Sequence, residues 1–113
     1  MIKAIHKVST LLILAIGIIH TSCTFYYFHS LSEPAIWFAG TGLAGIFVAL
    51  LNMGIWSNNA SVMARRSVAA ANFIFFFWLA ASVSAIPRPS QVFVAAVGAT
   101  MVISAEFFNQ LKK

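Results

Sequence analysis

Four side chains that could do chemistry lie within apolar stretches of this sequence: His20, Asn52, Asn72 and Glu106. Polar and ionisable groups at membrane depth are costly, and they usually have a partner or a functional role. An imidazole accepts a hydrogen bond or takes up a proton, and a carboxylate balances a cation. These residues are therefore the first candidates for a binding or transport site.

His20 begins a polar stripe, because Thr24 and Tyr27 follow it at helical spacing and share its face. Counting 1.5 Å per residue from the predicted helix ends places His20 slightly outward of the membrane midplane, level with Trp78 and Gly98. We expect His20 to face the bundle interior beside Trp78 and Gly98 and to line a ligand pocket that opens outward through Thr24 and Tyr27. The alternative for Trp78 is ordinary aromatic packing.

A second polar group is predicted nearer the cytoplasmic surface, where Asn52, Asn72 and Glu106 come out at similar depth. The simplest interpretation is a hydrogen-bonded cluster that joins three helices. In one alternative, Glu106 extends to basic residues at the interface, which would be Arg65, Lys112 or Lys113. In another, Glu106 belongs to a proton- or cation-coupled site.

The histidines do not predict a metal centre, because His6, His20 and His29 lie at three different depths and zinc requires three or four ligands. The one cofactor arrangement that the depths allow is a haem between His20 and Met101. It rests on one His and one Met at loosely matching depths in the membrane. His20 and Glu106 are separated by more than two helical turns, so no nucleophile with an adjacent base can be assembled. The sequence therefore does not favour an enzyme, and the cofactor stays unknown.

The segment Gly40-Thr41-Gly42-Leu43-Ala44-Gly45 spells G-x-G-x-x-G, the dinucleotide-binding pattern. That pattern works only between a strand and a helix, and here it lies within an apolar run with no strand before it. We expect Gly40, Gly42 and Gly45 to allow a close helix contact instead, within the bundle or between protomers.

The elements that must position these residues are four apolar segments, approximately 8–28, 35–56, 67–86 and 91–108. The length of each segment is close to the roughly 20 residues that a helix needs to cross about 30 Å of hydrocarbon. The chain is 61% hydrophobic and 8% charged, against about 25% charged residues in a typical soluble domain. The sequence predicts one all-α domain over residues 1–113, a bundle of four transmembrane helices.

Basic residues flank these segments mostly on one predicted side, as Lys3 with Lys7, Arg65 with Arg66, and Lys112 with Lys113. Only Arg88 falls on the other side. Because short cytoplasmic loops collect Lys and Arg, we expect a multi-pass inner (plasma) membrane protein with both termini in the cytoplasm. The net charge of +5 does not predict nucleic-acid binding, since the cations are dispersed and suit anionic lipid head groups.

The first half of the chain resembles families of small four-span bacterial inner-membrane proteins that have no assigned activity. Two stretches carry the resemblance, Gly17-Ile18-Ile19-His20-Thr21 and Ala35-Ile36-Trp37-Phe38-Ala39-Gly40-Thr41-Gly42. It implies the four-span fold and no substrate. Small multidrug transporters resemble the chain poorly, because its first span contains no glutamate.

Two functional hypotheses follow. In the first, the protein binds or transports a small molecule in an intramembrane pocket around His20, with Glu106 balancing charge. In the second, it is a non-catalytic accessory subunit of a larger membrane complex or a homo-oligomer, and its polar residues hold the bundle together. A haem or quinone protein is the third.

Overall fold

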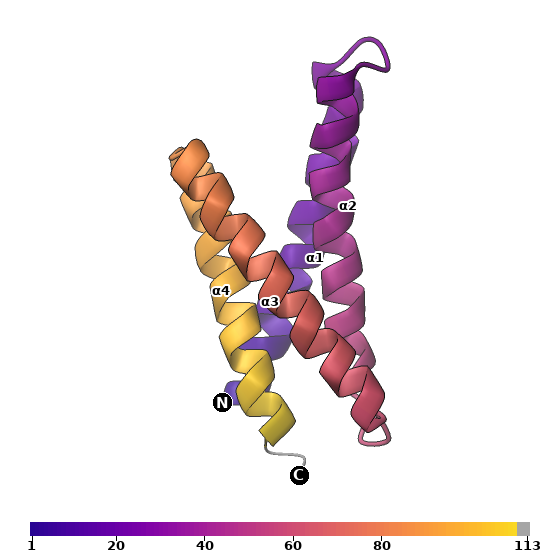
Figure 1. The fold of residues 1–113 in the computed structure, drawn as a ribbon, viewed down its shortest axis with the longest axis vertical. Coiled ribbons are helices and arrows are strands. Elements are labelled where there is room, and N and C mark those ends of the chain that lie inside the picture. Colours follow the sequence, from indigo (N-terminus) through magenta and orange to yellow (C-terminus); the bar gives the residue numbers. More distant parts are fainter. Residues whose placement is uncertain (111–113) are drawn as a thin grey trace.

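Four helices make up the secondary structure of residues 1–110, which are the part of the chain that the computed structural model describes (Figure 1). They are α1 (Ile2–Tyr27), α2 (Glu33–Gly54), α3 (Val62–Ala85) and α4 (Pro89–Gln110). Each is long and apolar enough to span a membrane. The predicted all-α four-helix class is confirmed. Lys112 and Lys113, assigned to the cytoplasmic side from the sequence, lie outside the described residues.

Three of the four helices, α1, α3 and α4, are longer than the predicted spans, and α1 and α3 are extended at their N-terminal ends. Helix α1 starts at Ile2 rather than at residue 8, and α3 starts at Val62 rather than at residue 67. Hydropathy marks the hydrocarbon-facing part of a helix, whereas caps mark its ends. The Ser61 hydroxyl caps α3 by accepting a hydrogen bond from the Ala64 N–H at 3.1 Å. Proline in the first turn of α2 and α4 also favours helix initiation.

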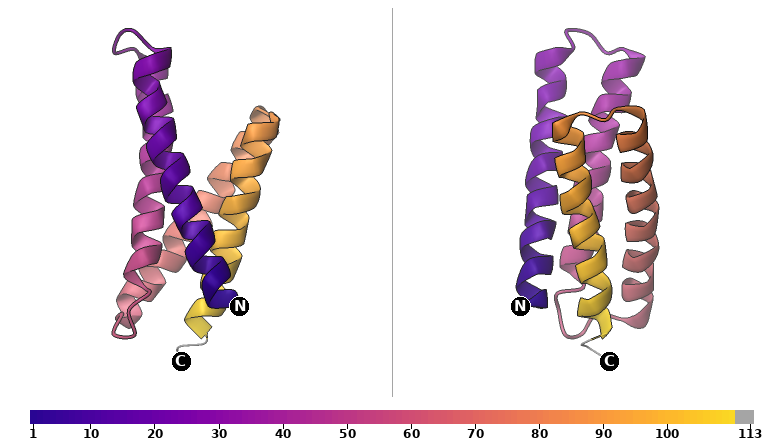
Figure 2. Two further views of the ribbon diagram at one scale, coloured as in Figure 1. Left: turned by 180° about the vertical axis from the view of Figure 1, so that it is seen from behind. Right: turned by 90° about the vertical axis from the view of Figure 1, so that its left-hand side faces the viewer.

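The bundle consists of two helical hairpins, α1–α2 and α3–α4, which meet at one end and diverge toward the other (Figure 1 and the left view of Figure 2). Helix α1 packs mainly on α2 and α4, and α3 packs mainly on α4. The N-terminus, the α2–α3 connector and the end of α4 lie together where the hairpins meet. We call this the basic end, because Lys3, Lys7, Arg65 and Arg66 lie there.

The apolar core follows the crossing of the two hairpins. Its larger cluster draws on all four helices and consists of Ile13, Val48, Ala49, Phe75, Leu79 and Met101. A smaller cluster of Ile55, Val68 and Phe108 lies nearer the basic end. Most of the surface of each helix points away from this core, as expected of helices whose other faces contact lipid.

Glycines bring α1 and α2 into close contact at Gly17 and Gly42. A Cβ added at Gly42 would collide with the Thr21 hydroxyl and lie 2.9 Å from the Gly17 carbonyl oxygen, and one added at Gly17 would lie 2.8 Å from the Gly42 carbonyl oxygen. Gly45 is buried in the same contact, with Gly17 Cα 3.8 Å from its Cβ position. Gly40, by contrast, faces open space. The contact therefore uses Gly42 and Gly45 as expected but Gly17 in place of Gly40, because Gly40 lies about 200° around α2 from Gly42 and faces away from α1.

Candidate functional site

Buried polar side chains gather near the basic end, where the two hairpins meet. They come from all four helices and comprise His6, Ser9, Thr10, Asn52, Asn72, Ser104 and Asn109. Ser9 and Thr10 satisfy their hydroxyls locally by donating to carbonyl oxygens of the preceding turn, including that of His6. The remaining members make contacts between helices. This buried polar centre therefore ties the helices together at one end.

Asn52 and Asn72 form the strongest of these contacts. The Asn52 Nδ2 donates to the Asn72 Oδ1 at 2.6 Å, and the Asn72 Nδ2 donates back to the Asn52 Oδ1 at 3.0 Å. Asn52 also donates to the Val48 carbonyl oxygen. The structure thus brings together two of the three residues expected in the polar cluster.

Glu106 does not join that pair. Its carboxylate is exposed and accepts a hydrogen bond from Gln110 Nε2 at 3.3 Å on its own helix. Within residues 1–110 Asn52 donates to Asn72 and to Val48, Asn72 donates to Asn52, and neither amide donates to the carboxylate. Nor does Glu106 pair with Arg65, whose guanidinium donates to the Ala60 carbonyl oxygen and to Asn109 Oδ1. Within residues 1–110 the Glu106 carboxylate forms no ion pair.

A cavity of about 450 Å³ lies between α3 and α4 beside Glu106. We call it the α3–α4 pocket, and its lining residues are Ala69, Asn72, Phe73, Val102, Ile103, Ala105, Glu106, Phe107 and Asn109. The small side chains of Ala69 and Ala105 leave space between the helices. Asn72 connects the pocket to the buried polar centre, since its side chain both lines the cavity and bonds Asn52. Sequence reasoning named Asn72 and Glu106 but did not find the cavity they share.

His6 was not recognised as a candidate from the sequence. Its side chain is fully buried, with Nδ1 3.4 Å from the Ser104 hydroxyl and the ring 5.1 Å from that of Phe108. Its Nε2 has no hydrogen-bond partner within residues 1–110. The signal was present, because His6, Ser9 and Thr10 share one helical face. Three polar residues at that spacing would have indicated that α1 extends, with a buried side, beyond its apolar run.

His20 lies against α2 and not in an open pocket. Its half-buried ring stacks on Phe38, with centroids 3.9 Å apart and planes 20° apart. Tyr27 also packs edge-on against Phe38, at 6.1 Å. The Thr24 hydroxyl is buried and has no hydrogen-bond partner within residues 1–110. Phe38 therefore packs on two of the three residues of the expected polar stripe, His20 and Tyr27, where the pocket was expected.

Trp78 and Gly98, the expected partners of His20, belong to the other hairpin. Gly98 packs on α3, where a Cβ would collide with Leu79 and lie 3.6 Å from Phe75 Cε1. Trp78 is 49% exposed, and no ring contact joins it to His20 within the described residues. Equal depth did not imply contact, because the two hairpins diverge beyond the core (Figure 1).

The haem arrangement is not assembled either. Met101 is fully buried in the core cluster that contains Ile13, two turns before His20 on α1, whereas His20 stacks on Phe38. Within residues 1–110, no three His, Cys, Asp or Glu side chains come together in a way that would hold a metal ion.

Comparison of this chain with protein-family models, with curated proteins and with solved structures gives no match.

Proposed function

We propose that this integral membrane protein binds a small amphiphilic cation in the α3–α4 pocket, with the Glu106 carboxylate balancing its charge. One observation carries the proposal: the cavity combines a carboxylate that has no ion-pair partner in residues 1–110 with the rings of Phe73 and Phe107. This moves the ligand-binding hypothesis from His20 to Glu106.

The lining of the pocket selects the chemistry of the ligand. Phe73 and Phe107 offer apolar surface to the body of a ligand, and aromatic faces attract cations within about 6 Å. Asn72 and Asn109 add amide groups, although each already has one partner. A volume of about 450 Å³ lies in the range of roughly 300–1,000 Å³ usual for small-molecule sites. A hydrophobic ammonium or phosphonium ion fits these properties.

The depth of the pocket suits a ligand that first enters the membrane. Glu106 lies four residues before the end of α4 and Asn72 ten residues after the start of α3, which places them about 6 and 15 Å along the helices from the basic end. The pocket thus extends from near the head-group level into the hydrocarbon region. A carboxylate at the shallow end draws the charged group, while the rings accept the apolar body.

The orientation in the membrane is part of the proposal. All four basic residues within α1 and α3 lie at the basic end, and Arg88 lies in the connector at the opposite end. Lys and Arg are preferred in cytoplasmic loops, which supports an inner-membrane protein whose basic end faces the cytoplasm. The α3–α4 pocket would then be reached from the cytoplasmic half of the bilayer.

The test uses the purified chain in neutral detergent and two probes of nearly equal size and opposite charge, tetraphenylphosphonium and tetraphenylborate. Equilibrium dialysis should show saturable binding of the phosphonium only. Glu106→Gln should weaken that binding about tenfold or more, because a charge-assisted contact is worth roughly 1.5–3 kcal/mol. Glu33→Gln is the matched control, since Glu33 is the only other acidic residue and lies at the far end of α2.

Equal binding of both probes, or equal loss in the two variants, would show that the ions partition into detergent or bind diffusely. That result would favour the accessory-subunit hypothesis. One observation supports that alternative: the outer parts of the two hairpins diverge (Figure 1) and leave large apolar side chains such as Trp78 exposed, which a helix of another protein could contact. It predicts a discrete complex larger than the bundle when the native membrane is extracted in mild detergent.

A further inference from the structure

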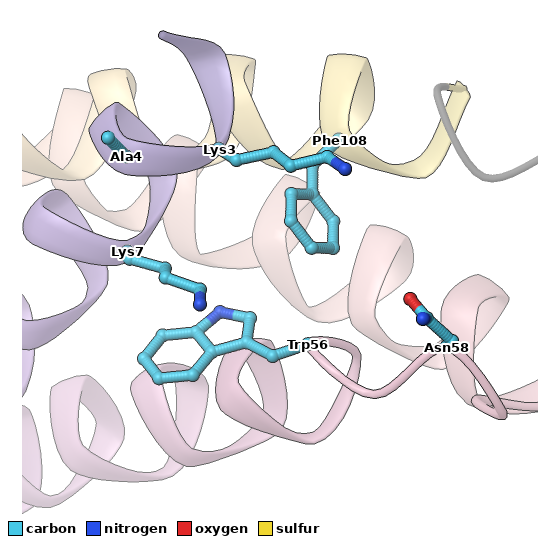
Figure 3. A pocket seen from close by; sticks show the side chains of 6 residues that line it. All are labelled: Lys3, Ala4, Lys7, Trp56, Asn58 and Phe108. Carbon is cyan, nitrogen blue, oxygen red and sulfur yellow. The ribbon is translucent and has the colours of Figure 1, made fainter.

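Two lysines of α1 line a cavity of about 390 Å³ at the basic end, separate from the α3–α4 pocket (Figure 3). We call it the lysine pocket, and it is lined by Lys3, Ala4, Lys7, Trp56, Asn58 and Phe108. These residues come from the first turns of α1, from the α2–α3 connector and from the last turns of α4. The pocket therefore exists only when the basic end is assembled.

No acidic side chain among residues 1–110 compensates the charge of this pocket. Within residues 1–110 neither Lys3 nor Lys7 forms an ion pair, and the two acidic side chains, Glu33 and Glu106, do not line the cavity. Lys3 and Lys7 are four residues apart and so share one face of α1, where two like charges repel each other. An anion held between them would relieve that repulsion.

The walls of the pocket orient one of the lysines. The Lys7 ammonium lies 5.4 Å from the centroid of the Trp56 ring, in a cation–π contact that keeps it over the cavity. Figure 3 shows the Lys3 side chain running across the opening toward Phe108. Asn58 contributes an exposed carboxamide, a further hydrogen-bond donor. Two ammonium groups and an amide beside apolar rings suit a phosphate group that is attached to an apolar or neutral body.

The preference of cytoplasmic loops for basic residues explains how many cations this end carries but not why two of them share a cavity. Arg65, at the same end, is held by Ala60 and Asn109, and the exposed Arg66 does not line the pocket. Lys3 and Lys7 are thus distinguished from their basic neighbours by geometry.

We propose that the lysine pocket binds a phosphate ester, either the head group of an anionic lipid or a soluble phosphate monoester, through Lys3 and Lys7. The site is independent of the proposed cation pocket and would stand if that pocket bound nothing. Its position at the ends of the helices, beside an indole that favours the membrane interface, places it where both sources of phosphate are available.

The test monitors Trp56 fluorescence in the full chain carrying Trp37→Phe and Trp78→Phe, so that the remaining indole reports on the pocket. The probes are dihexanoylphosphatidylglycerol, dihexanoylphosphatidylcholine and glycerol 3-phosphate, added to protein in neutral detergent. Saturable change with phosphatidylglycerol alone assigns the lipid head group, and equal or tighter binding of glycerol 3-phosphate assigns a soluble ligand. The absence of a saturable response to both anionic probes overturns the proposal.

Paired substitutions separate a built site from diffuse surface charge. Lys3→Gln with Lys7→Gln should weaken binding about 25-fold, at about fivefold for each lysine near an anionic group. The double variant Arg66→Gln with Arg88→Gln also removes two positive charges, but from outside the pocket. It should change the affinity less than about twofold. Lys7→Arg alone should retain binding, which controls for loss of fold. Equal weakening in the two double variants would contradict the proposal.

Discussion

Asn52 and Asn72 exchange two hydrogen bonds between α2 and α3, with donor–acceptor distances of 2.6 and 3.0 Å. Both side chains are almost fully buried. Two amides that face each other satisfy a donor and an acceptor each without introducing charge into the bundle. Since α2 and α3 otherwise make few contacts, this pair is a principal link between these two helices.

Removal of either amide should destabilise the bundle. Asn52→Ala and Asn72→Ala should each cost about 1–2 kcal/mol, because one polar group stays buried without its partner. The double variant should cost less than the sum of the two. Thermal unfolding in detergent measures this, with the exposed Asn59→Ala as control. Strict additivity would show that the two amides are energetically independent.

Gly42→Leu should weaken the contact between α1 and α2. Its side chain would meet the Thr21 hydroxyl and the backbone of Gly17, and neither helix can yield without losing the core beside it. Overpacking of this kind typically costs about 1–3 kcal/mol. Gly40→Leu is the matched control, since a Cβ there meets nothing within 4 Å. A midpoint of thermal unfolding that falls equally in both variants would remove the glycine contact as the cause.

His6→Ala should destabilise the protein more than His29→Ala. His6 is fully buried against Phe108 and Ser104, so truncation leaves a cavity and typically costs about 2 kcal/mol or more. His29 is exposed in the α1–α2 connector. The same unfolding assay compares them, and indistinguishable midpoints would argue that the basic end repacks freely.

His20→Ala should leave binding of a hydrophobic cation unchanged within about twofold, on the usual independence of separated sites. The reason is that His20 stacks on Phe38 in the α1–α2 hairpin, whereas the described residues that line the α3–α4 pocket all belong to α3 and α4. Dialysis with tetraphenylphosphonium provides the measurement. Loss of binding in this variant, with Glu106→Gln silent, would return the site to the position expected from the sequence.

Labelling of single cysteines tests the proposed orientation. In a Cys23→Ala background, Ser30→Cys should react with a membrane-impermeant maleimide in intact bacterial cells, and Asn58→Cys should react only after the membrane is opened. Both positions are exposed in connectors, at opposite ends of the bundle. The reverse pattern would place the basic end outside.

The sequence alone determined the class of fold and the approximate extent of each helix. A run of apolar residues long enough to cross a membrane forms a helix, because a helix satisfies the hydrogen bonds of its own backbone within the segment. The Asn52–Asn72 contact and the use of Gly42 and Gly45 in helix packing also followed from depth and spacing. These features depend on properties of a single helix, or on the membrane depth of a residue, which short connectors between the helices fix.

Only the tertiary structure decided which faces meet. Depth along the membrane fixes one coordinate of a residue and leaves the rotation and tilt of its helix open. His20, Trp78 and Gly98 share a depth, yet the divergence of the hairpins assigns His20 to Phe38 and Gly98 to Leu79. At the basic end Glu106 and Asn72 line the same pocket, yet the Glu106 carboxylate bonds Gln110 whereas Asn72 bonds Asn52. Crossing angles arise from how side chains of several helices interlock, so a pattern read along one segment does not contain them.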